Sequence, residues 1–273
     1  MKFKNLEDKC QYYRGLTDYR IQGNNDILVM LDGKNFSKLI KNNFKKPFDD
    51  DFINMMNKTA QFLCENVQGV KFAYTQSDEI SLLITDYDTP ETDTLFGGRI
   101  CKIQSILASL ATSEFNRQFI LYHLKDKGYI GIEYENVIRK MKMAQFDCKV
   151  WTVPNQNDAF AWFLYRQLDC VKNSKQQTAQ TYLPHKQLLG KDADMQIQMV
   201  KEFNGIDWNT FENKYKFGRF VYKVETTETK MIPQLNNTIT YTRNKFTPMP
   251  AWDLTTEEGK LKFIEKTFKF END

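Results

Sequence analysis

The sequence has few residues of the kinds that hold zinc or build a disulfide framework. Its 273 residues include two histidines and five cysteines, an odd number. No two cysteines have C-x-x-C spacing, so neither a zinc site nor a paired disulfide scaffold is expected. The simplest interpretation is a chain that works in a reducing compartment.

Long apolar runs and a strong net charge are also absent. No apolar run approaches the ~20 residues of a membrane span. The first ten residues are polar, and Glu7 and Asp8 argue against a signal or transit peptide. The 38 basic and 35 acidic residues leave a net charge of +3, which neither demands nor excludes a nucleic-acid partner. We therefore expect a cytoplasmic protein with no membrane partner.

What is present is a folded chain with a clear pattern in its first half. Hydrophobic residues make up 41% of the sequence and aromatic residues 14%, which excludes disorder as the default. Apolar spacing predicts strand Ile27–Leu31, helix Phe48–Val67, strands Val70–Tyr74 and Ile80–Ile84, helix Ile100–Tyr122 and strand Phe146–Val153. This βαββαβ order is typical of α+β ferredoxin-like folds, including polymerase palms, although many functions share it.

The pattern changes after Pro154. Helical spacing predicts helices over Asn157–Lys172 and Gln196–Phe203, and short strands follow over Gly218–Glu225 and Thr238–Thr242. We expect residues 1–154 to form a catalytic palm and residues 155–273 to form a helical extension with a small β element.

Two aspartates stand at special points of the predicted sheet. Asp32 ends the first strand, and Asp78 lies at the tip of the hairpin between the second and third. In a split βαβ sheet the third strand lies between the first two and runs against both, which brings Asp32 close to Asp78. Two carboxylates suit Mg²⁺, and Glu79 could add charge beside them. The structural alternative is an ordinary Asp-Gly turn and a solvated hairpin tip.

Several separated segments resemble the tRNA-His guanylyltransferase superfamily. They are Asp32–Phe36, Phe44–Pro47, Tyr74–Glu79, Phe146–Lys149, Arg166–Cys170, Pro184–Leu188 and Gly205–Trp208. The resemblance implies a palm that adds nucleotides in the 3′→5′ direction to the 5′ end of tRNA, after ATP or GTP has activated the 5′-monophosphate. It also implies a homotetramer.

The same resemblance implies roles for individual residues. Asp32, Asp78 and Glu79 would be catalytic, and Asp32, Asp78 and the Gly33 carbonyl would hold two Mg²⁺ ions. The incoming nucleotide would be bound by Lys34, Asn35, Phe36 and Ser37, with Lys46 and Ser77 near its phosphates. The activating nucleotide or the tRNA end would lie near Lys149, Arg166, Asn173, Ser174 and His185.

The departures from the family pattern narrow the expected function. Enzymes specific for tRNA-His carry an H-I-N-N-L-Y-N-T stretch where this chain has Val171–Thr178. The missing histidine favours the like-protein branch, which repairs 5′-truncated tRNAs by templated addition. Ser37 replaces a frequent histidine, and Lys34 and Lys149 replace arginines, keeping the charge but losing bidentate geometry. Addition of a single guanylate to tRNA-His, or a catalytically silent RNA- or nucleotide-binding module, are the alternatives.

Overall fold

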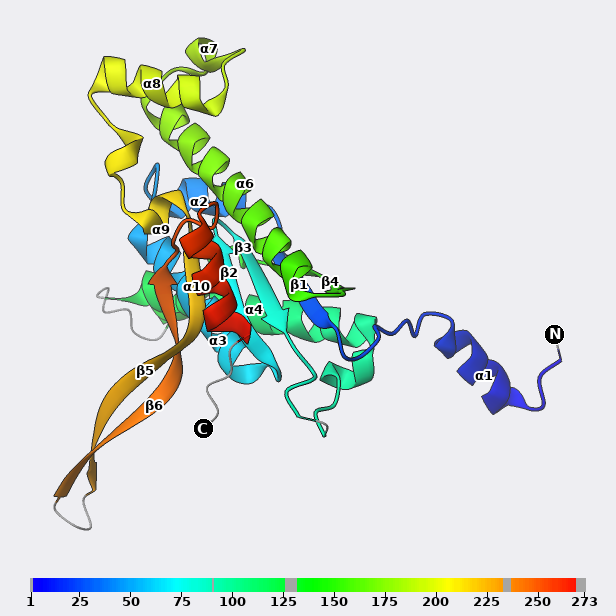
Figure 1. Cartoon of the computed structure of the whole chain (residues 1–273). Coiled ribbons are helices and arrows are strands. Elements are labelled where there is room, and N and C mark those ends of the chain that lie inside the picture. Colours follow the sequence, from blue (N-terminus) through cyan, green and yellow to red (C-terminus); the bar gives the residue numbers. More distant parts are fainter. Residues whose placement is uncertain (1, 90, 126–131, 233–236, 269–273) are drawn as a thin grey trace.

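A computed structural model of the chain describes residues 2–89, 91–125, 132–232 and 237–268. Figure 1 shows the elements in chain order. They are α1 (Leu6–Gly15), β1 (Asp26–Gly33), α2 (Phe36–Asn43), α3 (Asp50–Asn66), β2 (Val70–Gln76), β3 (Glu79–Ile84), η1 (Leu95–Gly98), α4 (Ile100–Leu124), α5 (Ile132–Lys140), β4 (Phe146–Val153), α6 (Gln156–Tyr182), α7 (His185–Leu188), α8 (Ala193–Asn204), η2 (Trp208–Thr210), α9 (Asn213–Lys216), β5 (Arg219–Ile232), β6 (Asn237–Pro250) and α10 (Glu257–Phe268).

The named strands form one sheet in the order β4-β1-β3-β2-β5-β6, and every neighbouring pair is antiparallel. As expected, β3 lies between β1 and β2. The later strands differ from the expectation of a small β element in the extension. β5 joins the edge of β2, with Ala73 opposite Val221, and it continues with β6 into a hairpin much longer than the predicted strands. Both halves of the chain therefore contribute to one mixed α/β fold.

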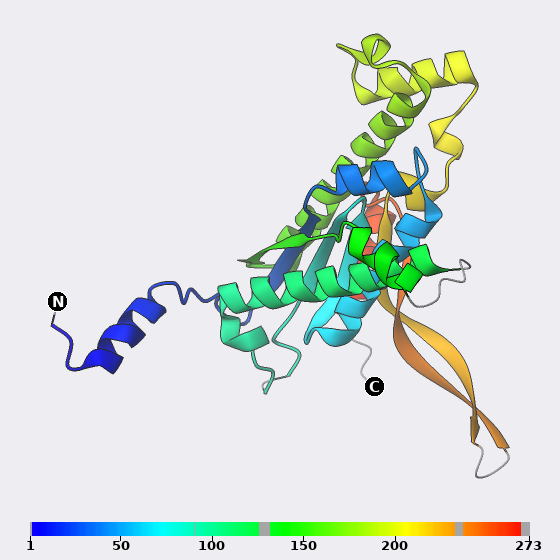
Figure 2. The ribbon, with the colours of Figure 1, turned by 180° about the vertical axis from the view of Figure 1, so that it is seen from behind.

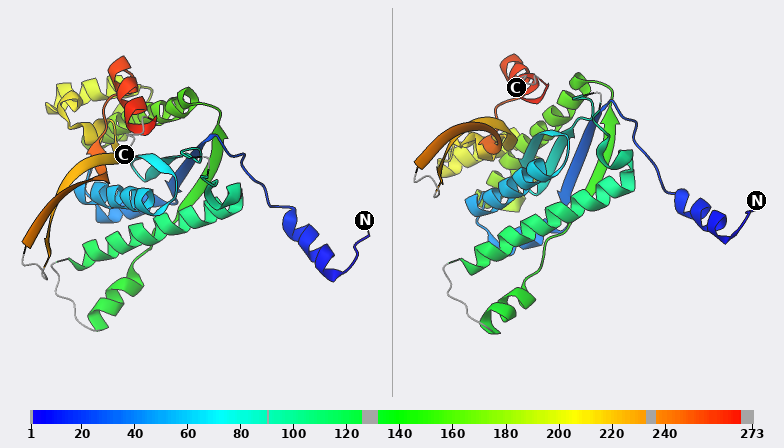
Figure 3. Two further views of the ribbon diagram at one scale, coloured as in Figure 1. Left: turned by 60° about the horizontal axis from the view of Figure 1, so that its bottom comes forward. Right: turned by 90° about the horizontal axis from the view of Figure 1, so that it is seen from below.

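Helices cover both faces of this sheet (Figure 3). Ile27, Val29 and Leu31 of β1 pack with α3 and α4, whereas Leu28 packs with α6 and α10 on the opposite face. All four side chains are fully buried. A strand that is covered by helices on both faces buries every side chain, so its sequence is a continuous apolar run. This run is the feature from which β1 can be predicted.

The first predicted helix begins where local capping chemistry places it. Asp49 is the N-cap of α3, and its Oδ1 accepts hydrogen bonds from the backbone N–H groups of Asp51 and Phe52 at 2.9 and 3.1 Å. The helix predicted from Asn157 runs further than expected, to Tyr182. Its last turns bury Thr178 and Ala179 beside α8, a contact that is not encoded in the local spacing.

Three parts project from the sheet and its helices (Figures 1 and 2). One is α1, which buries none of its side chains. Another is the β5–β6 hairpin. The third, here called the α6 arm, consists of the distal half of α6 with α7 and α8. None of the helices in the described ranges is both long enough and apolar enough to cross a membrane.

Candidate active site

The end of β1 and the turn between β2 and β3 lie side by side. Asp32 is directly opposite Glu79 in the antiparallel register, and the Gly33 N–H donates a 3.1 Å hydrogen bond to the carbonyl oxygen of Asp78. Ser77 adopts a φ of 46°, a left-handed conformation that closes the tight turn. The structure thus brings Asp32 and Asp78 together, as the strand order predicts.

Burial raises the pKa of both aspartates. Desolvation is the largest cause for Asp78, opposed by the Ser77 hydroxyl, which donates to Oδ1 at 2.9 Å. Desolvation is also the largest cause that raises the pKa of Asp32. Repulsion from its cross-strand neighbour Asp147 raises this pKa further, whereas attraction to Lys149 lowers it. Among the residues described, neither Asp32 nor Asp78 forms an ion pair. Such carboxylates favour the arrival of a cation.

The donor atoms at this position suit a hard divalent cation. Asp32 and Asp78 supply carboxylate oxygens, and Gly33, which directly follows Asp32, supplies a backbone carbonyl oxygen. No group of three or more His, Cys, Asp or Glu side chains that could hold a metal ion is found within the described ranges. Mg²⁺ does not require such a cage, because it takes one or two carboxylates and completes its shell with water and phosphate oxygens. The residues present therefore fit Mg²⁺ better than a metal that needs an all-protein site.

Glu79 is engaged in a buried ion pair with Arg166 of α6. The Arg166 Nε donates to Glu79 Oε1 at 2.7 Å, and Nη2 also contacts Asp169 at 3.1 Å. Glu79 is only 4% exposed; burial raises its pKa and Arg166 opposes that rise. The side chain is thus held against α6 instead of facing solvent as a base. Arg166, expected at the activating nucleotide or the tRNA end, fastens the hairpin tip to α6 in this structure.

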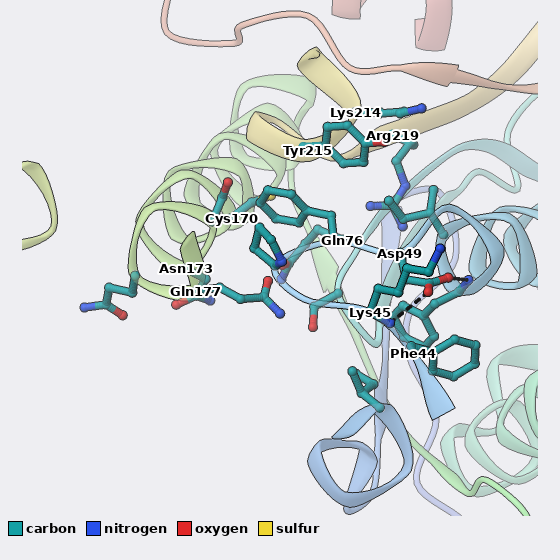
Figure 4. A pocket seen from close by; sticks show the side chains of 18 of the residues that line it. Phe44, Lys45, Asp49, Gln76, Cys170, Asn173, Gln177, Lys214, Tyr215 and Arg219 are labelled. Atoms are coloured by element: carbon teal, nitrogen blue, oxygen red, sulfur yellow. Dashed lines mark hydrogen bonds between the residues drawn. The ribbon is translucent and has the colours of Figure 1, made fainter. Parts of the chain in front are cut away.

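A cavity of about 320 Å³ opens beside the hairpin tip, between the start of α3 and α6 (Figure 4). Its wall includes three residues expected from the sequence, namely Ser77, Asn173 and Ser174. Ser174 is 4% exposed, and its Oγ accepts a 2.9 Å hydrogen bond from Trp208 Nε1. The other lining residues are Ile40, Phe44, Lys45, Pro47, Phe48, Asp49, Phe52, Ile53, Gln76, Cys170, Gln176, Gln177, Gln180, Lys214, Tyr215 and Arg219. The size falls in the usual range for small-molecule pockets, roughly 300–1,000 Å³.

The segment after β1 is divided between surface and core. Lys34, Asn35 and Ser37 are exposed, and Asn35 has a left-handed φ of 59° at the start of α2. Phe36 is different, because its ring is 1% exposed and packs edge-on against Phe115 and Phe146 at 5.1 Å. The expectation that Phe36 lines the nucleotide therefore fails for its side chain, which fills the core. A contact from this position would use the backbone.

The remaining predicted residues lie at different distances from the carboxylates. Lys149 is close enough to Asp32 to influence its pKa. Lys46 is exposed, between two residues that line the cavity, but it is not part of the wall. His185 is exposed on α7, at the far end of the α6 arm (Figure 1), so the structure does not bring it to the carboxylates.

Sequence patterns miss several residues at the site. Asp147 is opposite Asp32 because β4 pairs with β1, a pairing that was not specified from the sequence. Lys214 and Tyr215 both contact Asp50, and Arg219 begins β5; together they form one wall of the cavity. No local signal marks these three residues, because they reach the site only when β5 joins the edge of β2.

Comparison with known proteins agrees with this architecture. A family model described as tRNAHis guanylyltransferase matches residues 7–154. A bacterial tRNA(His) guanylyltransferase-like protein in complex with ATP superposes with a TM-score of 0.78 at 26% identity, over 97% of this chain and 99% of the other. A probable tRNA(His) guanylyltransferase from Dictyostelium discoideum is 27% identical over 215 residues, which span 74% of this chain and 77% of that relative. An uncharacterised protein of Acanthamoeba polyphaga mimivirus is 26% identical over 230 residues, or 80% and 77% of the two chains.

The matched segment contains β1 to β4, and with them Asp32, Asp78 and the turn that joins them. Residues 7–154 are more than half of the 273 in the chain. The chain belongs to the tRNA(His) guanylyltransferase family, whose members are nucleotidyltransferases.

Proposed function

We propose that the protein adds nucleotides to the 5′ end of tRNA in the 3′→5′ direction, with the 3′ strand as template. One observation carries this proposal: the exposed Asp32 and the half-buried Asp78, both with raised pKa values, lie together without an ion-pair partner in the described residues, beside a polar cavity. The solved relatives support nucleotide binding, because their structures contain ATP and GTP. The 5′-truncated tRNAs expected from the sequence are the substrates we infer.

We also infer that β1 to β4, with α3 and α4, form a ferredoxin-like polymerase palm. The order β4-β1-β3-β2 with antiparallel neighbours supports this inference. In this proposal residues 1–154 carry the catalytic carboxylates and residues 155–273 form the extension. The extension would bind RNA through the α6 arm, where His185 lies.

Two Mg²⁺ ions would be held by Asp32, Asp78 and the Gly33 carbonyl. When bound, they would supply a polarised hydroxyl and a neutralised leaving oxygen. The protein's own contribution is positioning. The Glu79–Arg166 pair holds the hairpin tip, and Lys149 places positive charge near Asp32, where phosphate oxygens would gather.

The reaction that we propose consists of two transfers. An oxygen of the tRNA 5′-monophosphate attacks the α-phosphorus of ATP or GTP and releases pyrophosphate. The 3′-hydroxyl of an incoming nucleotide then attacks the activated 5′-phosphorus and releases AMP or GMP. Where the tRNA end is already a triphosphate, pyrophosphate leaves instead.

A single guanylate added to tRNA-His is the second candidate, and the names of the Dictyostelium discoideum and other relatives favour it. The replaced stretch Val171–Thr178 favours templated repair instead.

We also propose a homotetramer in a reducing compartment such as the cytoplasm; all five cysteines are free.

An extension assay separates these functions. The purified chain is given Mg²⁺ and 5′-truncated tRNAs of several identities, with each nucleotide omitted in turn. Templated repair predicts additions that pair with the 3′ strand of every tRNA, whereas the second candidate predicts one guanylate on tRNA-His alone.

The variants Asp32→Ala and Asp78→Ala are expected to abolish extension, and Asp8→Ala on the exposed α1 serves as the matched control. Full activity in Asp32→Ala would overturn the metal assignment. Binding of tRNA without any release of pyrophosphate, AMP or GMP by the unaltered chain would favour a non-catalytic module.

A further inference from the structure

Arg219, the first residue of β5, is a buried cation in the cavity wall. Its side chain is 5% exposed and extends toward the cavity centre (Figure 4). Nε donates a 3.1 Å hydrogen bond to the side-chain oxygen of Asn57. Nη2 is buried and has no hydrogen-bond partner, and no ion pair involving Arg219 occurs among the residues described. A fully desolvated guanidinium without a counter-charge is costly in a folded protein.

The groups around Arg219 do not supply the missing negative charge. Tyr74 and Cys170 face it, but burial raises the pKa of Tyr74 well above its ordinary value and that of Cys170 to about 11. Both are therefore neutral near pH 7. Arginine stays charged even where burial lowers its pKa, as it does here.

Asp49 is the single carboxylate among the residues that line the cavity. Its oxygens are already occupied, because they accept hydrogen bonds from the backbone N–H groups of Lys45, Asp51 and Phe52 at 2.8 to 3.1 Å. Lys214, the other cation on this wall, is shared between Asp50 and Glu212 at 3.1 and 3.5 Å. Lys45, which also lines the cavity, is exposed to solvent, so Arg219 is the buried cation of this lining for which the described residues show no ion-pair partner.

The backbone holds this cation in place. Gly218 has a φ of +81°, and a Cβ there would come within 2.7 Å of the Tyr74 ring and 2.9 Å of the Thr75 carbonyl oxygen. The close approach of Gly218 to β2 sets the start of β5 against the cavity. The guanidinium is therefore presented at a fixed point, as an anchoring group for a ligand must be.

We propose that Arg219 is an anion-anchoring residue of this chain and that it binds the polyphosphate of a nucleoside triphosphate in the cavity. The proposal rests on the proposed function for the identity of the ligand. The amides of Asn173 and Gln177, on the α6 side of the cavity, are further hydrogen-bond donors that line it, although the Asn173 amide also donates to Asp169 (Figure 4).

The test measures binding of inorganic triphosphate by calorimetry, with no RNA or nucleoside present. Loss of a hydrogen bond to a charged group predicts that Arg219→Met weakens this binding roughly 10- to 100-fold. Arg219→Lys should retain part of the affinity, and Arg243→Met, on the exposed part of β6, should retain all of it. Unchanged affinity in Arg219→Met would overturn the proposal.

A second variant keeps the test decisive if Arg219→Met does not fold. Asn57→Asp places a carboxylate beside the Arg219 Nε and so supplies an internal counter-charge. We expect this variant to melt at a higher temperature than the unaltered chain without ligand, and to bind inorganic triphosphate more weakly. Equal affinity together with an unchanged melting temperature would contradict an uncompensated cation at this point.

The source of the phosphate is resolved by a competing ligand, a 5′-monophosphorylated oligoribonucleotide. Binding that depends on Arg219 for the oligoribonucleotide but not for inorganic triphosphate would overturn the assignment to a nucleotide. Failure of the unaltered chain to extend truncated tRNA, with Arg219-dependent triphosphate binding intact, would count against the proposed function alone.

Discussion

Asp32 and Asp78 show how a site can weaken the fold that carries it. Because their pKa values are raised in the folded chain, the folded state binds more protons than the unfolded state between the ordinary and the raised values. Stability therefore falls as the pH rises through that window, and both carboxylates are ionised and repelling above it. A bound cation reverses this loss.

The first prediction is that Asp78→Asn stabilises the chain at pH 7 in the absence of divalent cations. Removal of one desolvated charge is expected to raise Tm by about 2–4 °C, which corresponds to about 1 kcal/mol in a chain of this size. Thermal unfolding followed by circular dichroism measures the change, with exposed Asp8→Asn as the control. The gain should shrink as the pH falls through the raised pKa and when Mg²⁺ is added. A lower Tm in Asp78→Asn would show that the charge is already compensated.

Glu79 and Arg166 make the opposite case, a buried pair in which each charge needs the other. Glu79→Gln leaves Arg166 with Asp169 as its remaining carboxylate partner, and we expect a loss of about 3 kcal/mol in the free energy of unfolding. Glu135→Gln, in an exposed pair with Arg139, should change it by less than about 0.5 kcal/mol. Denaturant unfolding measures the free energy of unfolding of both variants. Similarly small losses in both would show that the buried pair stabilises the fold no more than the exposed pair does.

At the scale of elements, the α6 arm has its own small core. Leu183, Leu188 and Val200 pack around Ala179, away from the two clusters that flank the sheet. Trp208 ties the next segment back to α6 through its hydrogen bond to Ser174. Because this cluster is separate, we expect the arm to open without unfolding of the sheet.

We predict that Leu183→Ala opens the arm locally. Leu183 is 8% exposed, and its truncation should cost about 2 kcal/mol, the low end for a buried leucine, because the cluster is small. Hydrogen exchange should accelerate in α7 and α8 and stay unchanged in β1 and β3. Leu189→Ala, at a position that is 61% exposed, is the control. Faster exchange in β1 as well would contradict an independently folded arm.

At the scale of the whole molecule, stability resides in the six-stranded sheet and the helices on its two faces. Phe263 of α10 is fully buried against one face, while α1 buries none of its own side chains. The N-terminal helix therefore contributes little to the folding of a single chain.

Deletion of residues 2–15 is accordingly expected to shift Tm by no more than about 2 °C, as for changes confined to the surface. By contrast, Phe263→Ala should lower the free energy of unfolding by about 3–5 kcal/mol. Differential scanning calorimetry of both variants tests the contrast. A large drop in Tm on deletion would show that α1 makes stabilising contacts in solution. Contacts between the subunits of the proposed homotetramer would be the first explanation to test.

Several parts of the site follow from local pattern in the amino-acid sequence. A buried strand that ends at Asp32, and a hairpin whose turn holds Asp78, follow from apolar spacing and turn chemistry. Their meeting follows from the strand order, because β3 must lie between β1 and β2. These features depend on neighbours in the chain and on one topological rule, so they can be predicted without coordinates.

Which side chains face the site depends on how distant segments of the chain pack together. Phe36 turned out to be a core residue, and Arg166 pairs with Glu79, 87 positions away in the chain. Arg219 reaches the cavity because β5 joins β2, although the local pattern predicts only a short strand there. The physical reason is that burial and ion pairing are set by contacts between distant segments, whose free energies leave no periodic trace in the sequence.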